Sequence, residues 1–245
     1  KTTTTSLTYD IMKRHAKKAL LVGNIEIPYS GYALESDKDS VTVAEISSFQ
    51  LETMVTFKPH ITAILNITPD HLDRHKTLEN YIAIKESITK NQDGNDFCVL
   101  NYNDPVLREF GKTPRCKVIF FSSSEELESG VFLRGDTMII KENGVETPVC
   151  TTKDTSLVGM HNYENIMAAI AMTHAMGVPL DTIRQGIKEF TAVEHRIEFV
   201  TEKNGVKYYN DSKGTNPDAA IKAVYAMPSP TILIGGGYDK KSSYD

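Results

Sequence analysis

The first residues of the chain could bind phosphate. Lys1 and Thr2 open a threonine-rich stretch, and a lysine followed by a threonine ends the phosphate-binding loop G-x-x-x-x-G-K-[ST]. In that loop the lysine neutralises the β- and γ-phosphates of a nucleotide, and the hydroxyl binds Mg²⁺. The glycines of the loop are not in this chain. Taken alone, the pair therefore favours a helix N-terminus whose hydroxyls cap free N–H groups.

A carboxylate follows the β-branched run at residues 41–46, where Glu45 begins the sequence Glu-Ile-Ser-Ser-Phe-Gln-Leu-Glu. The carboxyl end of a strand opens into the crevice where α/β folds bind ligands. Beside a phosphate-binding lysine, such a carboxylate would complete a Mg²⁺ site. The alternative is that Ser47 and Ser48 simply cap a helix that contains Glu52, and both interpretations are compatible.

Residues 66–75 place five groups that could bind a metal or transfer a proton directly after another apolar run. The five are Asp70, His71, Asp73, Arg74 and His75. The two histidines are four residues apart and would share a helix face. A zinc site would need a third ligand, and the H-E-x-x-H pattern is absent. We predict a functional site here; the alternative is a solvated loop in which Asp70 acts as a cap.

Three later segments carry polar groups suited to a nucleotide. Asn162 and Asn165 offer the donors and acceptors that an adenine edge requires, although Asn162 could equally cap the helix that follows. Arg196 lies at an apparent domain boundary, from which it could reach a phosphate. Asp211 follows a strand and could bind a ribose hydroxyl. Lys85 lies alone on an amphipathic helix, and its spacing predicts a solvated surface charge.

The elements that would position these groups alternate between strands and helices. Strands are expected at 19–22, 41–46, 61–67, 97–101 and 117–121, with helices at 2–18, 78–91, 162–176 and 180–190. This order predicts an α/β fold with a mostly parallel sheet flanked by helices. Residues 130–149 alternate with period two around Asn143-Gly144, which predicts a small antiparallel appendage. A hairpin at 197–210, a helix at 217–225 and a strand at 231–234 would begin a second α/β domain.

Composition limits the class of protein. The 245 residues fit one to two domains, and the net charge of −5 argues against a broad basic face that binds nucleic acid. Three widely spaced cysteines, Cys98, Cys116 and Cys150, exclude a disulfide framework and a CxxC zinc or redox site. No signal peptide and no apolar stretch long enough for a bilayer is visible, so we expect a cytoplasmic protein without membrane insertion. The start at Lys1, without a methionine, suggests a piece of a longer protein.

The order of these segments resembles the Mur ligase family. The most specific pieces are Ser-Ser-Phe-Gln-Leu-Glu at 47–52 and Asn-Asp-Ser-Lys-Gly-Thr-Asn at 210–216. Within the family, they look like the members that add D-glutamate to UDP-N-acetylmuramoyl-L-alanine in peptidoglycan precursor synthesis. The resemblance implies a central ATP-binding domain of P-loop type at 1–193, lacking the loop glycines, and the first part of a C-terminal Rossmann-like domain at 194–245.

The resemblance also implies a nucleotide and metal site. Lys1 matches the lysine on the ATP phosphates, Thr2 and Glu45 match ligands of one Mg²⁺, and Thr3 lies beside them. His71 matches a ligand of a second Mg²⁺. Lys85 matches a lysine that is carried as a carbamate, which turns an ammonium into a carboxylate that suits Mg²⁺.

The remaining matches concern ATP and the two other substrates. Asn162 and Asn165 match adenine contacts, Arg196 a phosphate contact and Asp211 a ribose contact. Five further positions match residues near the acyl and amino-acid substrates, namely Asn24, Ser47, Lys213, Thr215 and Lys240. The residues that the resemblance implies in catalysis are Lys1, His71, Lys85, Arg196 and Lys213.

The resemblance implies ATP-dependent amide-bond formation through an acyl phosphate, with ATP, UDP-N-acetylmuramoyl-L-alanine and D-glutamate as the binding partners of a monomer. The chain on its own, without the loop glycines and a nucleotide-sugar domain, is expected to be inactive. Two alternatives remain: a related ligase such as a folylpolyglutamate synthase, or a nucleotide-binding module without catalytic activity.

Overall fold

The structure is a computed structural model that describes residues 1–25, 27–191, 195–214, 217–227 and 229–237. The helices are α1 (Thr2–His15), α2 (Ser48–Glu52), α3 (Leu72–His75), α4 (Leu78–Glu86), α5 (Pro105–Phe110), α6 (Met160–Ala175), α7 (Leu180–Glu189) and α8 (Pro217–Tyr225). Short 3₁₀ turns span Tyr29–Tyr32 and Ser87–Thr89. The strands are β1 (Lys18–Gly23), β2 (Ser40–Glu45), β3 (Ile61–Ile64), β4 (Phe97–Asn101), β5 (Lys117–Ser122), β6 (Gly130–Arg134), β7 (Thr137–Glu142), β8 (Val145–Thr151), β9 (Glu198–Lys203) and β10 (Val206–Asn210).

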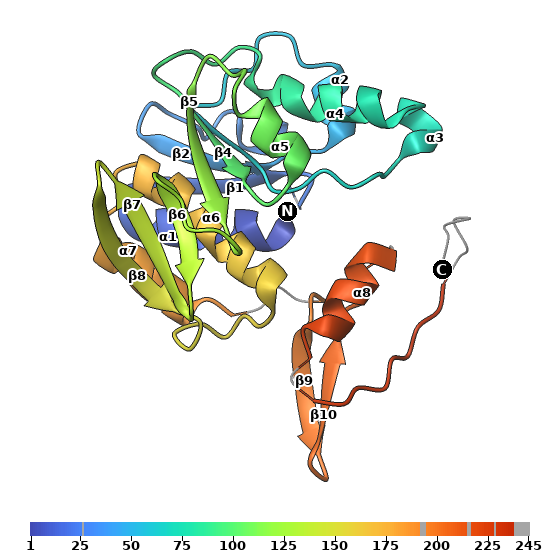
Figure 1. The fold of residues 1–245 in the computed structure, drawn as a ribbon. Coiled ribbons are helices and arrows are strands. Elements are labelled where there is room, and N and C mark those ends of the chain that lie inside the picture. The colour runs from blue at the N-terminus through green and yellow to red at the C-terminus, as the bar shows by residue number, and fades with distance from the viewer. Residues whose placement is uncertain (26, 192–194, 215–216, 228, 238–245) are drawn as a thin grey trace.

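A six-stranded sheet with the order β3-β4-β5-β6-β7-β8 forms the centre of the fold (Figure 1). The strands β3 to β6 are parallel, whereas β6, β7 and β8 are antiparallel. The predicted α/β fold with a mostly parallel sheet is confirmed. The antiparallel strands continue this sheet, because β6 pairs in parallel with β5 through Phe121 and Val131.

The strands β1 and β2 form a separate parallel pair. Their register aligns Gly23 with Glu45, so both strands end at the same level. The backbone is close here: a side chain at Gly23 would meet the carbonyl oxygen of Glu45, and Gly23 has a φ of +99°. A glycine is therefore required at the point where the chain leaves β1.

Three helices cover one face of the sheet. The helix α6 is buried around most of its circumference and crosses β3 to β6, while α1 and α7 pack against it. On α1, Leu7, Ile11 and Met12 form a buried stripe. On the opposite face, Leu107 of α5 packs against Cys98 and Leu100 of β4. The sheet is thus covered by helices on both faces, as parallel strands require.

Two asparagine–glycine pairs make the hairpin turns. Asn143 and Gly144 have φ angles of 53° and 78°, and Asn204 and Gly205 have 54° and 77°. Positive φ at both central residues defines the tight turn that matches strand twist. The hairpins predicted at 130–149 and 197–210 are confirmed.

Three predicted elements are shorter in the structure by three residues or more. The helix expected at 2–18 ends at His15, and Lys18 begins β1. The strand expected at 61–67 ends at Ile64, because side chains take over the next backbone groups: Asn101 Nδ2 donates to the Leu65 carbonyl and Asp104 accepts from the Ile67 amide. The helix expected at 78–91 ends at Glu86 and continues as a 3₁₀ turn.

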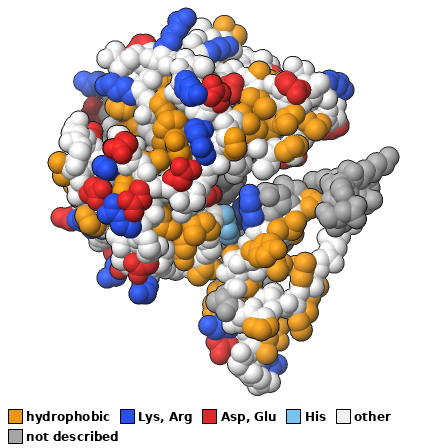
Figure 2. Space-filling model, viewed as in Figure 1, with side chains coloured by type: hydrophobic (Ala, Val, Ile, Leu, Met, Phe, Trp, Pro, Cys, Tyr) orange, Lys and Arg blue, Asp and Glu red, His pale blue; other side chains and the backbone are white. Residues whose placement is uncertain are grey.

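The C-terminal segment forms a second group, made of the β9–β10 hairpin and α8 (Figure 1). The strand predicted at 231–234 is wrong: Ile232 and Ile234 are more than 90% exposed and pair with no described strand. An extended segment becomes a strand only with a hydrogen-bonded neighbour. Hydrophobic side chains gather on this group in Figure 2. Phe199 and Tyr225 are among its exposed residues.

The boundary predicted between residues 193 and 194 lies outside the described residues. Within the described ranges, no helix combines the length and the hydropathy that crossing a membrane requires.

The contact between α1 and α7 gives a test of the packing. A methyl group at Gly186 of α7 would lie 2.5 Å from Ile11 Cγ1. Alanine is favoured over glycine in a helix by about 1 kcal/mol, but overpacking costs about 1–3 kcal/mol. We expect Gly186→Ala to lower the free energy of unfolding in urea by about 1 kcal/mol.

Gly94→Ala is the matched control, since no atom lies within 4 Å of an added methyl group there. We expect the control to unfold at the wild-type urea concentration. A Gly186→Ala variant as stable as the wild type would mean that α1 and α7 are less closely packed.

Candidate functional site

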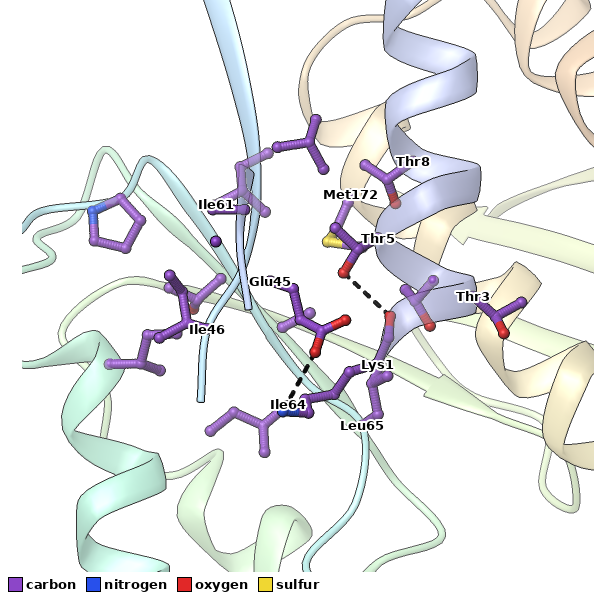
Figure 3. Close-up of a pocket in the computed structure, with 18 of the residues that line it drawn as sticks. Lys1, Thr3, Thr5, Thr8, Glu45, Ile46, Ile61, Ile64, Leu65 and Met172 are labelled. Carbon is purple, nitrogen blue, oxygen red and sulfur yellow. Dashed lines mark hydrogen bonds and ion pairs between the residues drawn. The ribbon is translucent and has the colours of Figure 1, made fainter. Parts of the chain in front are cut away.

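A cavity of about 1100 Å³ opens at the carboxyl ends of β2 and β3. Its walls are α1, the loop after β3, α4, the start of α6 and part of the C-terminal segment. Figure 3 shows Glu45 pointing from the end of β2 toward Lys1, with Thr3, Thr5 and Thr8 of α1 along one side. The crevice predicted from the strand ends is therefore present. Residues of the sheet-containing part and of the C-terminal segment both line it.

Glu45 is the polar centre of the cavity, and only 4% of the residue is exposed. Its carboxylate accepts hydrogen bonds from Thr2 Oγ1 and Asn24 Nδ2, each at 2.9 Å, and lies 3.6 Å from Lys1 Nζ. Burial alone raises the pKa of Glu45, but the Asn24 and Thr2 hydrogen bonds and the Lys1 charge outweigh it and hold the pKa below its ordinary value. The carboxylate is thus ionised and oriented.

The pairing of β1 and β2 positions this cluster. Because Gly23 and Glu45 are in register, the next residue, Asn24, donates from its backbone to the Glu45 carbonyl at 2.7 Å. The Asn24 side chain is then directed at the carboxylate. Lys1, Thr2, Asn24 and Glu45, separated in the sequence, thus meet at one point of the structure.

A chain of hydrogen bonds joins α1 to α6. Thr4 Oγ1 donates to Asn165 Oδ1 at 2.8 Å, Asn165 donates to Asn162 Oδ1 at 3.2 Å, and Asn162 donates to the Val158 carbonyl at 2.8 Å. Both asparagines and Thr3 line the cavity. The alternative that Asn162 caps the helix is wrong, because the N-cap is Gly159.

Lys85 is not the solvated charge that its spacing predicts. It lines the cavity, donates to the Asn66 carbonyl at 3.2 Å and lies 4.6 Å above the centre of the Tyr81 ring. Burial, followed by the charge of Lys1, lowers the pKa of Lys85 to about 8, against the opposing effects of Asp70 and Asp104. The helix α4 is amphipathic, but its Lys85 face turns toward the cavity rather than toward solvent.

The two histidines of the 66–75 loop do not share a helix face. His71 precedes the four-residue helix α3 with a left-handed φ of 52°, whereas His75 ends that helix and is buried. The side chain of His71 is half exposed and lies 3.5 Å from Asp70. Asp70 lines the cavity and His71 does not. The Asp70 carboxylate accepts from the His71 amide and does not cap α3.

Ser47 caps α2 in a reciprocal arrangement with Gln50, whose side chain accepts from the Ser47 backbone amide. The proposed capping role of Ser47 is confirmed, and Gln50 rather than Ser47 lines the cavity. Among the described residues, no group of three His, Cys, Asp or Glu side chains is arranged to hold a metal ion. A divalent cation here would need ligands from water or from a bound phosphate.

The C-terminal segment contributes Arg196 and Asp211 to the cavity. The Nε atom of Arg196 is buried without a hydrogen-bond partner, which marks a donor available to an anionic ligand. Burial raises the pKa of Asp211, although the Ile197 amide donates to it at 3.1 Å. Lys213 is exposed and does not line the cavity. Thr215 and Lys240 lie outside the described residues.

His161 and Tyr81 are cavity residues that the sequence did not single out. His161 lies beside Asn162, and burial together with Lys222 and Arg196 lowers its pKa. Tyr81 is buried beneath Lys85. His161 could have been found from its position next to Asn162 at a helix start, whereas the sequence around Tyr81 carries no such signal.

The Mur ligase middle domain model matches residues 1–173. All 245 residues align at 54% identity with UDP-N-acetylmuramoylalanine–D-glutamate ligase of Lachnoclostridium phytofermentans, and at 48% with the protein of that name from Thermoanaerobacter sp.. In both cases the chain covers 54% of the relative. The chain therefore spans about half the length of the curated relatives it matches.

Solved structures share the fold. UDP-N-acetylmuramoylalanyl-D-glutamyl-2,6-diaminopimelate–D-alanyl-D-alanyl ligase from Acinetobacter baumannii has a TM-score of 0.71 at 20% identity, over 92% of this chain and 51% of the other. The MurF ligase from Thermotoga maritima in complex with ADP has a TM-score of 0.69 at 19% identity, over 92% and 54%. The family match over residues 1–173 and this shared fold lead to one conclusion: the chain belongs to the Mur ligase family.

Proposed function

We propose that the protein carrying this chain joins D-glutamate to UDP-N-acetylmuramoyl-L-alanine at the expense of ATP, in peptidoglycan precursor synthesis. The observation that carries the proposal is the 46–54% identity with relatives named for this ligation, over essentially the whole chain. The cavity supports it with an ionised Glu45 beside a lysine and a threonine. Because the reaction consumes ATP, we further propose that it takes place in the cytoplasm.

The reaction would proceed in two displacements. The terminal carboxylate of the acyl substrate attacks the γ-phosphorus of ATP and ADP leaves, which gives an acyl phosphate. The amine of D-glutamate then attacks the acyl carbon, loses a proton, and inorganic phosphate leaves as the amide forms. Both steps bring anions together, so cationic side chains must offset their repulsion.

The described residues provide such cations. Lys1 lies beside Glu45 and would neutralise phosphate oxygens. Arg196 presents a buried Nε without a partner and would bind phosphate from the C-terminal side. Asn162 and Asn165 would orient the adenine, and Asp211 the ribose. Because these groups come from both parts of the chain, closure around the ligands would exclude water from the acyl phosphate.

Mg²⁺ fits the first of the two expected sites. Mg²⁺ is usually held by one or two carboxylates together with substrate phosphates, and Glu45 and the Thr2 hydroxyl offer oxygen donors on one side of the cavity. Of the two ligands expected for a second ion, Lys85 as its carbamate would line the cavity, whereas His71 does not line it and lies beside Asp70. When bound, the ions would neutralise charge on the transferring phosphoryl group.

Carbamylation of Lys85 is favoured by its surroundings. A carbamate forms when a neutral amine nitrogen attacks the carbon of CO₂ and a proton is released. With a pKa of about 8, about one in ten Lys85 side chains is neutral at pH 7 and about half at pH 8. Lys85 is thus far more reactive toward CO₂ than a lysine with the ordinary pKa of about 10.4.

The first test concerns the substrates. Phosphate release by the full-length protein should require both UDP-N-acetylmuramoyl-L-alanine and D-glutamate, and omission of either should lower the rate at least about tenfold, since only the complete reaction turns over. Glu45→Gln should abolish turnover, because it removes the only negative charge in the Thr2–Asn24–Glu45 cluster. Turnover with L-lysine, meso-diaminopimelate or a folate in place of these substrates would reassign the enzyme.

The second test concerns Lys85. After incubation with ¹³C-bicarbonate, the full-length protein should show a carbamate carbon signal that rises between pH 7 and pH 9, as the Lys85 amine loses its proton. Lys85→Ala should lose the signal and about a hundredfold in rate, and short carboxylic acids should restore part of the rate. Lys112→Ala is the control, because Lys112 pairs with Glu109 on the surface. Wild-type activity of Lys85→Ala without added acid would disprove the carbamate.

A further inference from the structure

The two sheets leave two strand edges that face one another across the cavity. Among the described strands, β2 pairs only with β1, and β3 pairs only with β4. Both free edges line the same cavity, from Ser40 and His60 at the amino ends of the strands to Glu45 and Leu65 at the carboxyl ends (Figure 3). The two strands therefore run in the same direction along it. We call the space between β2 and β3 the strand groove.

Helices cover both faces of the strand groove (Figure 1). On one face, α1 contacts β1 and β2, α6 contacts β3, and the two helices pack against each other. On the other face, Ile64 of β3 belongs to an apolar cluster against which Ile88 packs, and Leu51 of α2 and Tyr81 of α4 line the cavity. The groove therefore has the two covered faces of an interior position in a parallel sheet.

The walls of the strand groove are mostly apolar, and its carboxyl end at Glu45 is polar. Val41 and Val43 of β2 and Ile61 and Ala63 of β3 pack against the main core but are only partly buried, because they also line the cavity. Backbone N–H and C=O groups in such a place need hydrogen-bond partners, which an apolar ligand does not supply. A nucleotide needs polar groups along its length, and these lie at the Glu45 end only. A β-strand satisfies both the apolar side chains and the backbone groups.

We propose that the strand groove receives a short parallel β-strand from the part of the full-length protein that precedes Lys1, and that this strand joins the two sheets into one. The helix α1 begins at the carboxyl end of the groove, where Lys1 Nζ lies 3.6 Å from Glu45. A strand that leads into α1 through a short connection would therefore run parallel to β2 and β3, and would form a β-α-β unit with α1 and β1. The chain covers 54% of the relatives it matches, so such a segment has room in their length.

The dimensions of the groove define the strand. Because β2 has six residues and β3 has four, the strand would have about four to six residues and a length of about 13–20 Å. Helices on both faces require apolar side chains on both of its faces, and pairing on both edges excludes an internal proline. A segment joined to α1 is favoured over a second copy of the chain, because its attachment keeps it close to the groove. The inference needs only the sheet edges and their cover, so it does not rest on the proposed function.

Hydrogen–deuterium exchange of the unaltered full-length protein, resolved by peptide, tests whether the groove is filled. The strand β4 is paired on both sides and β8 on one side, so they are the references for an interior strand and an edge strand. We expect the amides of 40–45 and 61–64 to exchange as slowly as those of β4. An edge strand leaves about half of its amides unpaired, so exchange of about half of these amides at the rate of β8 would overturn the inference.

Disulfide cross-linking identifies the segment that fills the groove. Val43 and Ala63 both pack against the core that α1 and α6 build, so a strand between them would place alternate side chains beside both. Neighbouring strands lie about 4.8 Å apart, within the range of Cα separations that a disulfide spans. In the full-length protein, Val43→Cys and Ala63→Cys are each combined with a single cysteine at successive positions before Lys1 and oxidised with copper phenanthroline. We expect both to link to every second residue of the same short stretch.

Thr201→Cys is the matched control, because Thr201 is exposed on β9 and does not line the cavity; it should link to none of these positions. Links from Val43→Cys and Ala63→Cys to different stretches, links between two molecules, or no link in folded variants would overturn the inference. If the double variants do not fold, the exchange experiment decides, since it needs no substitution.

Discussion

The arrangement of the site depends on one constraint: Glu45 is ionised and almost completely buried. A buried carboxylate is stable only when donors and cations surround it. Thr2 from α1 and Asn24 from the end of β1 supply the hydrogen bonds, and Lys1 supplies the charge. Because these groups come from α1 and β1 and the carboxylate comes from β2, satisfying one carboxylate fixes α1 against β1 and β2 at the floor of the cavity.

In the loop after β3, side chains from other segments likewise satisfy buried polar groups, but these groups are backbone amides and carbonyls rather than a charged carboxylate. Where the strand stops, Asn101 and Asp104 satisfy the backbone of Leu65 and Ile67, and Lys85 satisfies that of Asn66. The loop is therefore free to leave the sheet without unpaired polar groups. Its path carries Asp70 to the cavity, and His75 ties its far end to α2.

Features that depend on the residue types of one short segment could be predicted from the sequence, whereas features that depend on packing between distant segments could not. The parallel strands, both asparagine–glycine hairpins and the position of Glu45 at a strand end depend on residue type and periodicity, which are visible along the chain. The burial of Lys85, the separation of His71 from His75 and the missing strand at 231–234 depend on what packs from distant segments. A lysine on an amphipathic helix looks the same whether solvent or a cavity faces it.

The cavity also shows why total charge was a poor guide to the ligand. The chain carries a net charge of −5, yet Lys1, Lys85 and Arg196 all line the cavity that holds the buried Glu45. Asp70, Glu164 and Asp211 line it as well. Lys1 lowers the pKa of Lys85, and Arg196 contributes to lowering that of His161, so these cations repel one another. A polyanion in the cavity would relieve that repulsion. The placement of these three cations in one cavity, rather than the charge summed over the chain, therefore favours an anionic ligand there.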